Sequence, residues 1–135
     1  MLQKRFGFTM IELVFVIVVL GILAAVAVPR LAATRTDAEI SAGAATVAAI
    51  RSGIVGLRQQ RILMGQNTWP VLNSDFSNVL TYPVKFTGSN GVWSNTSPTT
   101  WTYTVDGVDN NFNYNINFGT FNCTSGIYCN ALNGT

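Results

Sequence analysis

The 135-residue sequence contains no histidine. This absence excludes catalytic systems in which a histidine base activates a serine or cysteine nucleophile. The sequence also lacks the glycine-rich loops that bind phosphate in P-loop and dinucleotide-binding proteins. Beyond residue 65 it has three acidic side chains, and no two have the setting of a general acid and base. We therefore predict that the protein is not an enzyme and has no organic cofactor.

Charge is also scarce. Charged residues make up 10% of the chain, and the formal net charge is +2. Seven of the eight basic residues precede Gln66, and the part that follows is weakly acidic. The sequence therefore has no basic footprint of the kind that binds nucleic acid.

Only two cysteines are present, Cys123 and Cys129. Two cysteines without histidine are unlike a zinc site. If this part of the chain is exported, such a close pair is expected to form a disulfide, which would stabilise the fold by roughly 2–3 kcal/mol. Two free, buried thiols are the alternative.

A long apolar run is the main feature of the N-terminus. Residues Leu13–Val28 carry no charge, and Phe8–Val28 provides roughly the 20 residues that a transmembrane helix needs. Lys4 and Arg5 precede the run, which favours a cytoplasmic N-terminus. Glu12 lies within the run, where a carboxylate costs several kcal/mol unless it is paired or near the interface. Glu12 is therefore a candidate functional residue.

Three simpler interpretations of this segment compete. A secretory signal peptide would explain the basic start, the apolar region and the cleavage-like site Ala25–Ala27, but an early glutamate fits it poorly. A plain membrane anchor leaves Glu12 unexplained. A buried core helix is disfavoured by the unbroken apolar length.

The string Gly7-Phe8-Thr9-Met10-Ile11-Glu12-Leu13 resembles the prepilin processing motif of type IV pilins and type II secretion pseudopilins. Gly21–Ala25 and Pro29 continue the resemblance, which covers about the first third of the chain. It implies that a membrane-embedded prepilin peptidase cuts after Gly7 and N-methylates Phe8. It also implies that Glu12 faces the amine of Phe8, in its own subunit or in a neighbour.

The chemistry of these residues agrees with the resemblance. Glycine leaves the backbone at the cut unhindered. After cleavage, the Phe8 amine and the Glu12 carboxylate would each be costly if buried without a partner in an apolar filament core. As a pair they tolerate burial and can fix the register between subunits.

Beyond the span, Pro29 is expected to end or bend the helix. Pilin-like stems loosen in this stretch on assembly, so the resemblance implies loosening over Gly21–Pro29. Thr36-Asp37-Ala38-Glu39 has capping-box spacing and predicts that a helix restarts near Thr36. If instead the helix is unbroken from Phe8 to Met64, it is about 85 Å long.

The second half of this stem has the pattern of an amphipathic helix. Apolar or small residues recur every three or four positions and predict one stripe that packs on the head: Ile40, Gly43, Val47, Ile50, Ile54 and Leu57. Gly43, Gly53 and Gly56 each cost about 1 kcal/mol in a helix, which close packing would explain. Gly65 is the predicted helix stop.

The remaining sequence predicts an antiparallel sheet. Trp101–Val105 and Phe112–Phe118 alternate strictly, which indicates strands with one buried face. Asp106-Gly107 and Asp109–Asn111 mark the turn between them. Shorter strand candidates are Val79–Tyr82, Val84–Phe86 and Val92–Trp93.

A calcium site is one further hypothesis. Asp106, Asp109, Asn110 and Asn111 supply the oxygen ligands that a hard cation prefers, although their spacing is not that of an EF-hand. Major pseudopilins carry a calcium site in a late loop, so the resemblance gives this hypothesis a motive. Turn formation by Asp and Asn is the simpler and favoured explanation.

Together these features predict an α+β fold, in which a small antiparallel sheet packs on the second half of a long N-terminal helix. The expected parts are a leader at residues 1–7, a transmembrane and filament-core segment at 8–29, an amphipathic stem at 30–65, and a β-rich head with a disulfide loop at 66–135.

The resemblance implies a structural subunit of a type IV pilus. The chain would wait in membrane lipid as a single-pass protein of the bacterial inner membrane, with its head outside the cytoplasm. Prepilin peptidase would process it, and an assembly platform with its ATPase would polymerise it with copies of itself into a periplasmic or extracellular filament. A type II secretion pseudopilin is the alternative. The disulfide loop favours the pilin, whereas the short head and the calcium hypothesis favour the pseudopilin. A secreted or anchored binding module that does not polymerise is the third possibility.

Overall fold

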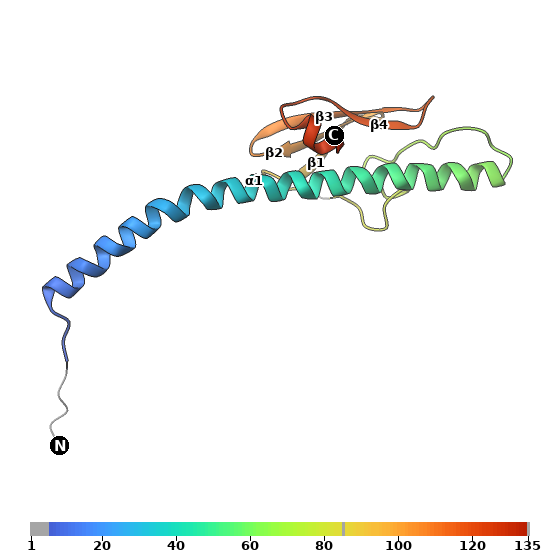
Figure 1. Ribbon diagram of the computed structural model, residues 1–135. Coiled ribbons are helices and arrows are strands. Elements are labelled where there is room, and N and C mark those ends of the chain that lie inside the picture. Colours follow the sequence, from blue (N-terminus) through green and yellow to red (C-terminus); the bar gives the residue numbers. More distant parts are fainter. Residues whose placement is uncertain (1–5, 85, 135) are drawn as a thin grey trace, which may run out of the picture. The chain divides into compact units, whose positions relative to one another are not determined.

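The computed structural model describes residues 6–84 and 86–134, with only the backbone described at Ala32. A long helix, α1 (Met10–Leu63), is followed by four strands and a short helix: β1 (Val92–Ser97), β2 (Thr100–Val105), β3 (Val108–Asn115), β4 (Thr120–Ser125) and α2 (Cys129–Asn133) (Figure 1). The predicted α+β layout is confirmed. The chain forms two compact units, up to Arg35 and from Thr36 onward, which are described separately.

In the first unit, α1 continues through both Gly21 and Pro29. Of the alternatives for Pro29 and Thr36, a helix end and a restart are therefore wrong, and the unbroken helix agrees with the structure, because Thr36–Glu39 lies inside α1. A bend at Gly21 or Pro29 stays a prediction. Proline removes one backbone hydrogen bond, and an apolar helix can tolerate this loss when the bonds on either side are kept. Loosening of Gly21–Pro29 on assembly stays a prediction.

The C-terminal end of α1 has a capped geometry. Gly65 adopts a left-handed conformation with φ +80°, and its N–H donates to the carbonyl of Ile62 at 2.9 Å. The N–H of Gln66 donates to the carbonyl of Arg61 at 2.8 Å. These two bonds form a Schellman motif, which confirms Gly65 as the helix stop.

The sheet of the second unit is an antiparallel meander with the order β1-β2-β3-β4. Asp106 and Gly107 join β2 to β3 with φ values of +48° and +72°, as a two-residue hairpin turn requires. Asp109–Asn111 belongs to β3 and not to the turn, so that part of the turn prediction is wrong. The second predicted strand ends at Asn115.

Some predicted strands are absent among the described residues, and one observed strand was not predicted. Val79–Tyr82 is not a strand, and neither Val84 nor Phe86 is in one; Lys85 lies outside the described residues. The predicted run at Val92–Trp93 begins β1. Strand β4 was not predicted, because it has only two buried residues, Phe121 and Cys123, and its other residues are polar, so the alternation is too short to recognise.

The core lies between the sheet and the part of α1 in the second unit. The buried side of the sheet supplies mostly aromatic rings, and a loop residue, Phe76, completes the cluster. The helix contributes Val47, Ile50 and Ile54, all with no exposed surface. Rings of Phe112 and Phe121 stack with centroids 5.2 Å apart. The predicted apolar stripe of the stem therefore faces the sheet.

Two of the three stem glycines are explained by this packing. A Cβ atom added to Gly53 would overlap the backbone of Val79 and would lie 2.8 Å from the Cβ of Val79. A Cβ on Gly43 would overlap the ring of Tyr103 and the side chain of Leu132. A Cβ on Gly56 would meet nothing within 4 Å. Close approach of the head thus requires glycine at positions 43 and 53 only.

We expect Gly53→Ala to lower the free energy of unfolding of the head by roughly 1–3 kcal/mol, because backbone of Val79 must shift. The matched variant Gly56→Ala should raise it by up to about 1 kcal/mol through helix propensity. Urea denaturation of the detergent-solubilised chain, followed by near-UV circular dichroism, measures both. Equal effects of the two variants would contradict the packing.

Candidate functional site

The N-terminal site is built around the first turn of α1. Residues Phe6–Thr9 are non-helical, and the helix begins at Met10. Thr9 occupies the N-cap position. Its Oγ1 accepts a hydrogen bond from the backbone N–H of Glu12 at 3.3 Å. The described structure therefore leaves the Gly7–Phe8 bond outside the helix.

Glu12 completes the cap from the other direction. Its Oε2 accepts hydrogen bonds from the backbone N–H of Thr9 at 2.9 Å and from the Thr9 hydroxyl at 3.0 Å. This reciprocal arrangement is a capping box. A carboxylate in the first turn is also favoured by the helix dipole. Within the single chain, Glu12 thus has a structural partner that sequence analysis did not assign to it.

Thr9 is the site residue that sequence analysis missed. The signal was present as the spacing Thr9-Met10-Ile11-Glu12. The same pattern was interpreted as a cap at Thr36, where the helix is continuous. The difference lies in context: the Thr9 box follows non-helical residues, whereas helix flanks the Thr36 sequence on both sides.

The apolar side chains of the described residues from Phe6 to Leu31 are exposed. The side chain of Phe8 is 87% exposed and that of Ile11 is 76% exposed. α1 includes a stretch that is long and apolar enough to cross a membrane, and none of that stretch is buried within the chain. Such a surface needs lipid or another apolar partner to cover it.

Comparison with known families identifies the N-terminal segment. Residues 2–28 match the family described as the prokaryotic N-terminal methylation motif. The chain carries a prepilin-type signal. This is the signal of type IV pilins and pseudopilins, and it implies processing by a prepilin peptidase. The prepilin signal and the apolar helix fit membrane anchoring. Among curated proteins and among solved structures, no match to the chain was found.

The prepilin signal includes residues whose structure is only partly described. Gly7, Phe8, Glu12 and Gly21 all lie within the match. The basic residues Lys4 and Arg5 lie outside the described residues. Pro29 follows the match directly and is part of α1.

The C-terminal end of the head is closed by a disulfide between Cys123 and Cys129. It connects β4 to the start of α2. Asn133 lies at the end of α2. Its Oδ1 accepts a hydrogen bond from the Cys123 N–H at 2.9 Å, and its Nδ2 donates to the Cys123 carbonyl at 3.2 Å. The disulfide and this amide together attach the last residues of the head to the sheet.

The four calcium candidates do not converge on one point. Asp109 and Asn111 lie on one face of β3, and the buried Asn110 lies on the opposite face. In three of the four, the side-chain oxygen already accepts a hydrogen bond from another residue of the head. The hydroxyl of Thr104 donates to Asp109, and the hydroxyl of Thr102 donates to Asn111. The backbone N–H of Tyr128 donates to Asn110. Their hydrogen bonds are those of strand and turn residues, which favours the turn interpretation over a calcium site.

We therefore expect calcium removal to leave the stability of the head unchanged. A site loaded at 100 times its dissociation constant would contribute about 2.7 kcal/mol, a shift of several degrees in Tm. Thermal denaturation with excess EDTA and with millimolar calcium tests this. A reproducible rise in Tm with calcium, absent with magnesium, would contradict the geometric argument.

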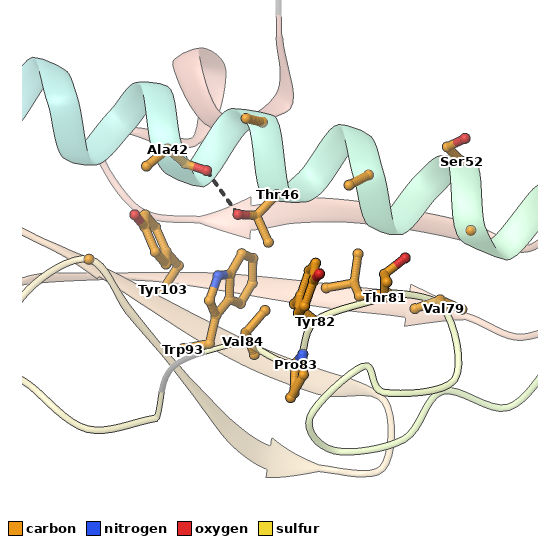
Figure 2. Close-up of a pocket in the computed structure, with 15 residues that line it drawn as sticks. Ala42, Thr46, Ser52, Val79, Thr81, Tyr82, Pro83, Val84, Trp93 and Tyr103 are labelled. Atoms are coloured by element: carbon orange, nitrogen blue, oxygen red, sulfur yellow. Dashed lines mark hydrogen bonds between the residues drawn. The ribbon is translucent and has the colours of Figure 1, made fainter.

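A groove of about 860 Å³ lies on the head between α1 and the loop that contains Tyr82 (Figure 2). Its helix side consists of small residues such as Ala42, Ala45 and Ala49, and the described residues of its lining include no acid, lysine, arginine or cysteine. Burial, and then the charge of Glu39, raise the pKa of Tyr103 in this lining, so the phenol stays neutral. Among the described residues, the lining thus holds no carboxylate or amine beside the Tyr103 phenol.

Proposed function

We propose that this protein is the structural subunit of a type IV pilus, a filament that forms outside the cytoplasm. The observation that carries the proposal is the prepilin signal on an apolar helix that the chain itself leaves uncovered. In the precursor, lipid covers this helix. In the filament, the corresponding helices of other copies replace the lipid.

The apolar helix supports polymerisation rather than simple anchoring. Helices that leave lipid for protein gain little from water exclusion, so packing and polar pairs decide their association. Glu12 is the only acid on the exposed part of α1 before Pro29. After cleavage, the new ammonium of Phe8 is the partner that such a buried carboxylate needs.

A structural role, without catalysis, agrees with the rest of the molecule. Residues 36–63 of α1 and the sheet share one apolar core, and the described groove carries no acid–base pair. We propose that the head lies outside the inner membrane, because Lys4 and Arg5 precede the span and the disulfide is favoured by an oxidising compartment.

Between the two filament systems, the head favours the pilus. A C-terminal disulfide loop is present. The late-loop calcium argument for a pseudopilin is weakened, because the four candidate residues do not converge. A pseudopilin in protein export is the second candidate, supported by the short head.

Expression with a complete pilus assembly system tests the proposal. Filaments sheared from cells should contain this chain as their main protein by mass spectrometry and should extend well beyond the envelope by electron microscopy. The variant Gly7→Val, which blocks the cut, should give none. Processed protein that stays in the membrane in an otherwise assembling strain would contradict the proposal; filaments confined to the periplasm would indicate a pseudopilus.

A further inference from the structure

We propose that Thr9 is a positioning residue for processing: its hydroxyl fixes the helix start at Met10 and so keeps the Gly7–Phe8 bond non-helical for the peptidase. This inference rests on the proposed processing of the chain. Hydrolysis adds one water across the Gly7–Phe8 amide and yields a carboxylate on Gly7 and an ammonium on Phe8. The peptidase supplies the catalytic groups, and Thr9 supplies only the shape of the substrate.

The geometry places the helix boundary two residues after the scissile bond. Residues Phe6–Thr9 are not helical. Thr9 Oγ1 accepts a hydrogen bond from the Glu12 N–H, which would otherwise be an unpaired donor in the first turn. The Thr9 N–H is itself held by Glu12 Oε2 at 2.9 Å. Because Thr9 and Glu12 bond each other reciprocally in this way, the helix has a defined first residue.

Without the Thr9 hydroxyl, the helix has an alternative start further upstream. Glycine is an acceptable N-cap, so Gly7 can take that position when residue 9 is a good helix former such as alanine. Phe8 would then be the first helical residue, and the scissile bond would be the first peptide of the helix. A protease that needs an extended backbone would meet its substrate in the wrong conformation.

Thr9 and Glu12 have separable roles in this arrangement. The bond from the Glu12 N–H to Thr9 Oγ1 uses the backbone of residue 12 and not its side chain. A change of the Glu12 side chain therefore leaves the N-cap acceptor in place. Loss of the Thr9 hydroxyl removes that acceptor and leaves the carboxylate in place.

Cleavage of the full-length precursor by prepilin peptidase in detergent tests the inference with Thr9→Ala, Thr9→Ser and the neighbouring control Met10→Ala. An N-cap contributes about 1 kcal/mol, so the ratio of competent to incompetent substrate in Thr9→Ala should fall about fivefold, and the competent fraction should fall by up to about that factor. Because only a fraction of the substrate is competent, KM should rise by that factor with kcat unchanged. Thr9→Ser should restore the KM, and Met10→Ala should not change it.

A second readout reports the helix start directly. In the labelled full-length precursor, the Cα chemical shift of Phe8 should move towards helical values in Thr9→Ala and not in Thr9→Ser. A wild-type KM for Thr9→Ala, or equal slowing by the Ala and Ser variants, would overturn the positioning role and leave the proposed function standing. A wild-type chain that the peptidase does not cut after Gly7 would overturn both.

Discussion

Replacement of Glu12 by valine should nearly abolish filament assembly while the chain is still inserted and cut after Gly7. In the filament core the Phe8 ammonium would then lack its anionic partner. An unpaired buried charge costs roughly 3–5 kcal/mol, which corresponds to a loss of assembled subunit of about a hundredfold or more. Insertion should be unaffected, because valine is more favourable than glutamate in a bilayer.

The measurement is the amount of this chain in sheared filaments relative to the processed chain in membranes. Glu12→Gln is the matched control, since an amide oxygen can still accept from the Thr9 N–H in a capping box but carries no charge. If the charge pair fixes subunit register, Gln and Val should fail alike. Normal filaments from Glu12→Val would show that the carboxylate has no role in assembly.

Replacement of Arg51 by alanine should strongly lower the stability of the head. The guanidinium of Arg51 joins α1 to both β4 and α2. It donates to the carbonyl of Phe121 at 2.9 Å, to the Oδ1 of Asn122 at 2.9 Å, and to both the carbonyl and Oδ1 of Asn133 at 2.9 Å and 3.0 Å. All four acceptors lose a charged donor in the variant.

Hydrogen bonds to a charged group contribute about 1.5–3 kcal/mol each, and water will replace some of them, so we expect a net loss of about 3 kcal/mol. For a domain of this size, that lowers Tm by at least about 10 °C. Arg51→Lys should recover little, because an ammonium cannot reproduce the planar fork. Scanning calorimetry of the full chain in detergent measures the change.

Arg58→Ala is the matched control for this prediction. Arg58 also lies on α1, but it contacts the ring of Trp69 at 4.5 Å and the exposed amide of Asn67. Such contacts contribute about 1 kcal/mol or less at exposed sites. A loss of stability at Arg58 as large as that at Arg51 would contradict the central role of the Arg51 cluster.

The sequence was most informative where its pattern is long or chemically unusual. The apolar run with one glutamate predicted the exposed helix, and the strict alternation at Trp101–Val105 predicted β2. Gly65 ends α1 because only a residue tolerant of positive φ fits the Schellman position. These features are local, so a single stretch of sequence determines each of them.

The failures depend on distant contacts or on context. The role of Arg51 could not be predicted from the local pattern, because its partners lie about 70 and 80 residues later in the chain. Pro29 was predicted to end or bend a helix that in fact continues through it. Asp109–Asn111 has turn composition but pairs with β2, because Val105 and Val108 set the hairpin register around only two residues.

The intact mass and N-terminal residue of the protein recovered from bacterial cells test the central claim most directly. We predict a chain that begins at an N-methylated Phe8, heavier by one CH2 unit and lighter by the two disulfide hydrogens than the unmethylated, reduced chain that begins at Phe8. A chain that begins at Val28 would indicate an ordinary signal peptide, and one that keeps Met1 would indicate a plain anchor. Either result would contradict prepilin processing and the roles given to Thr9 and Glu12.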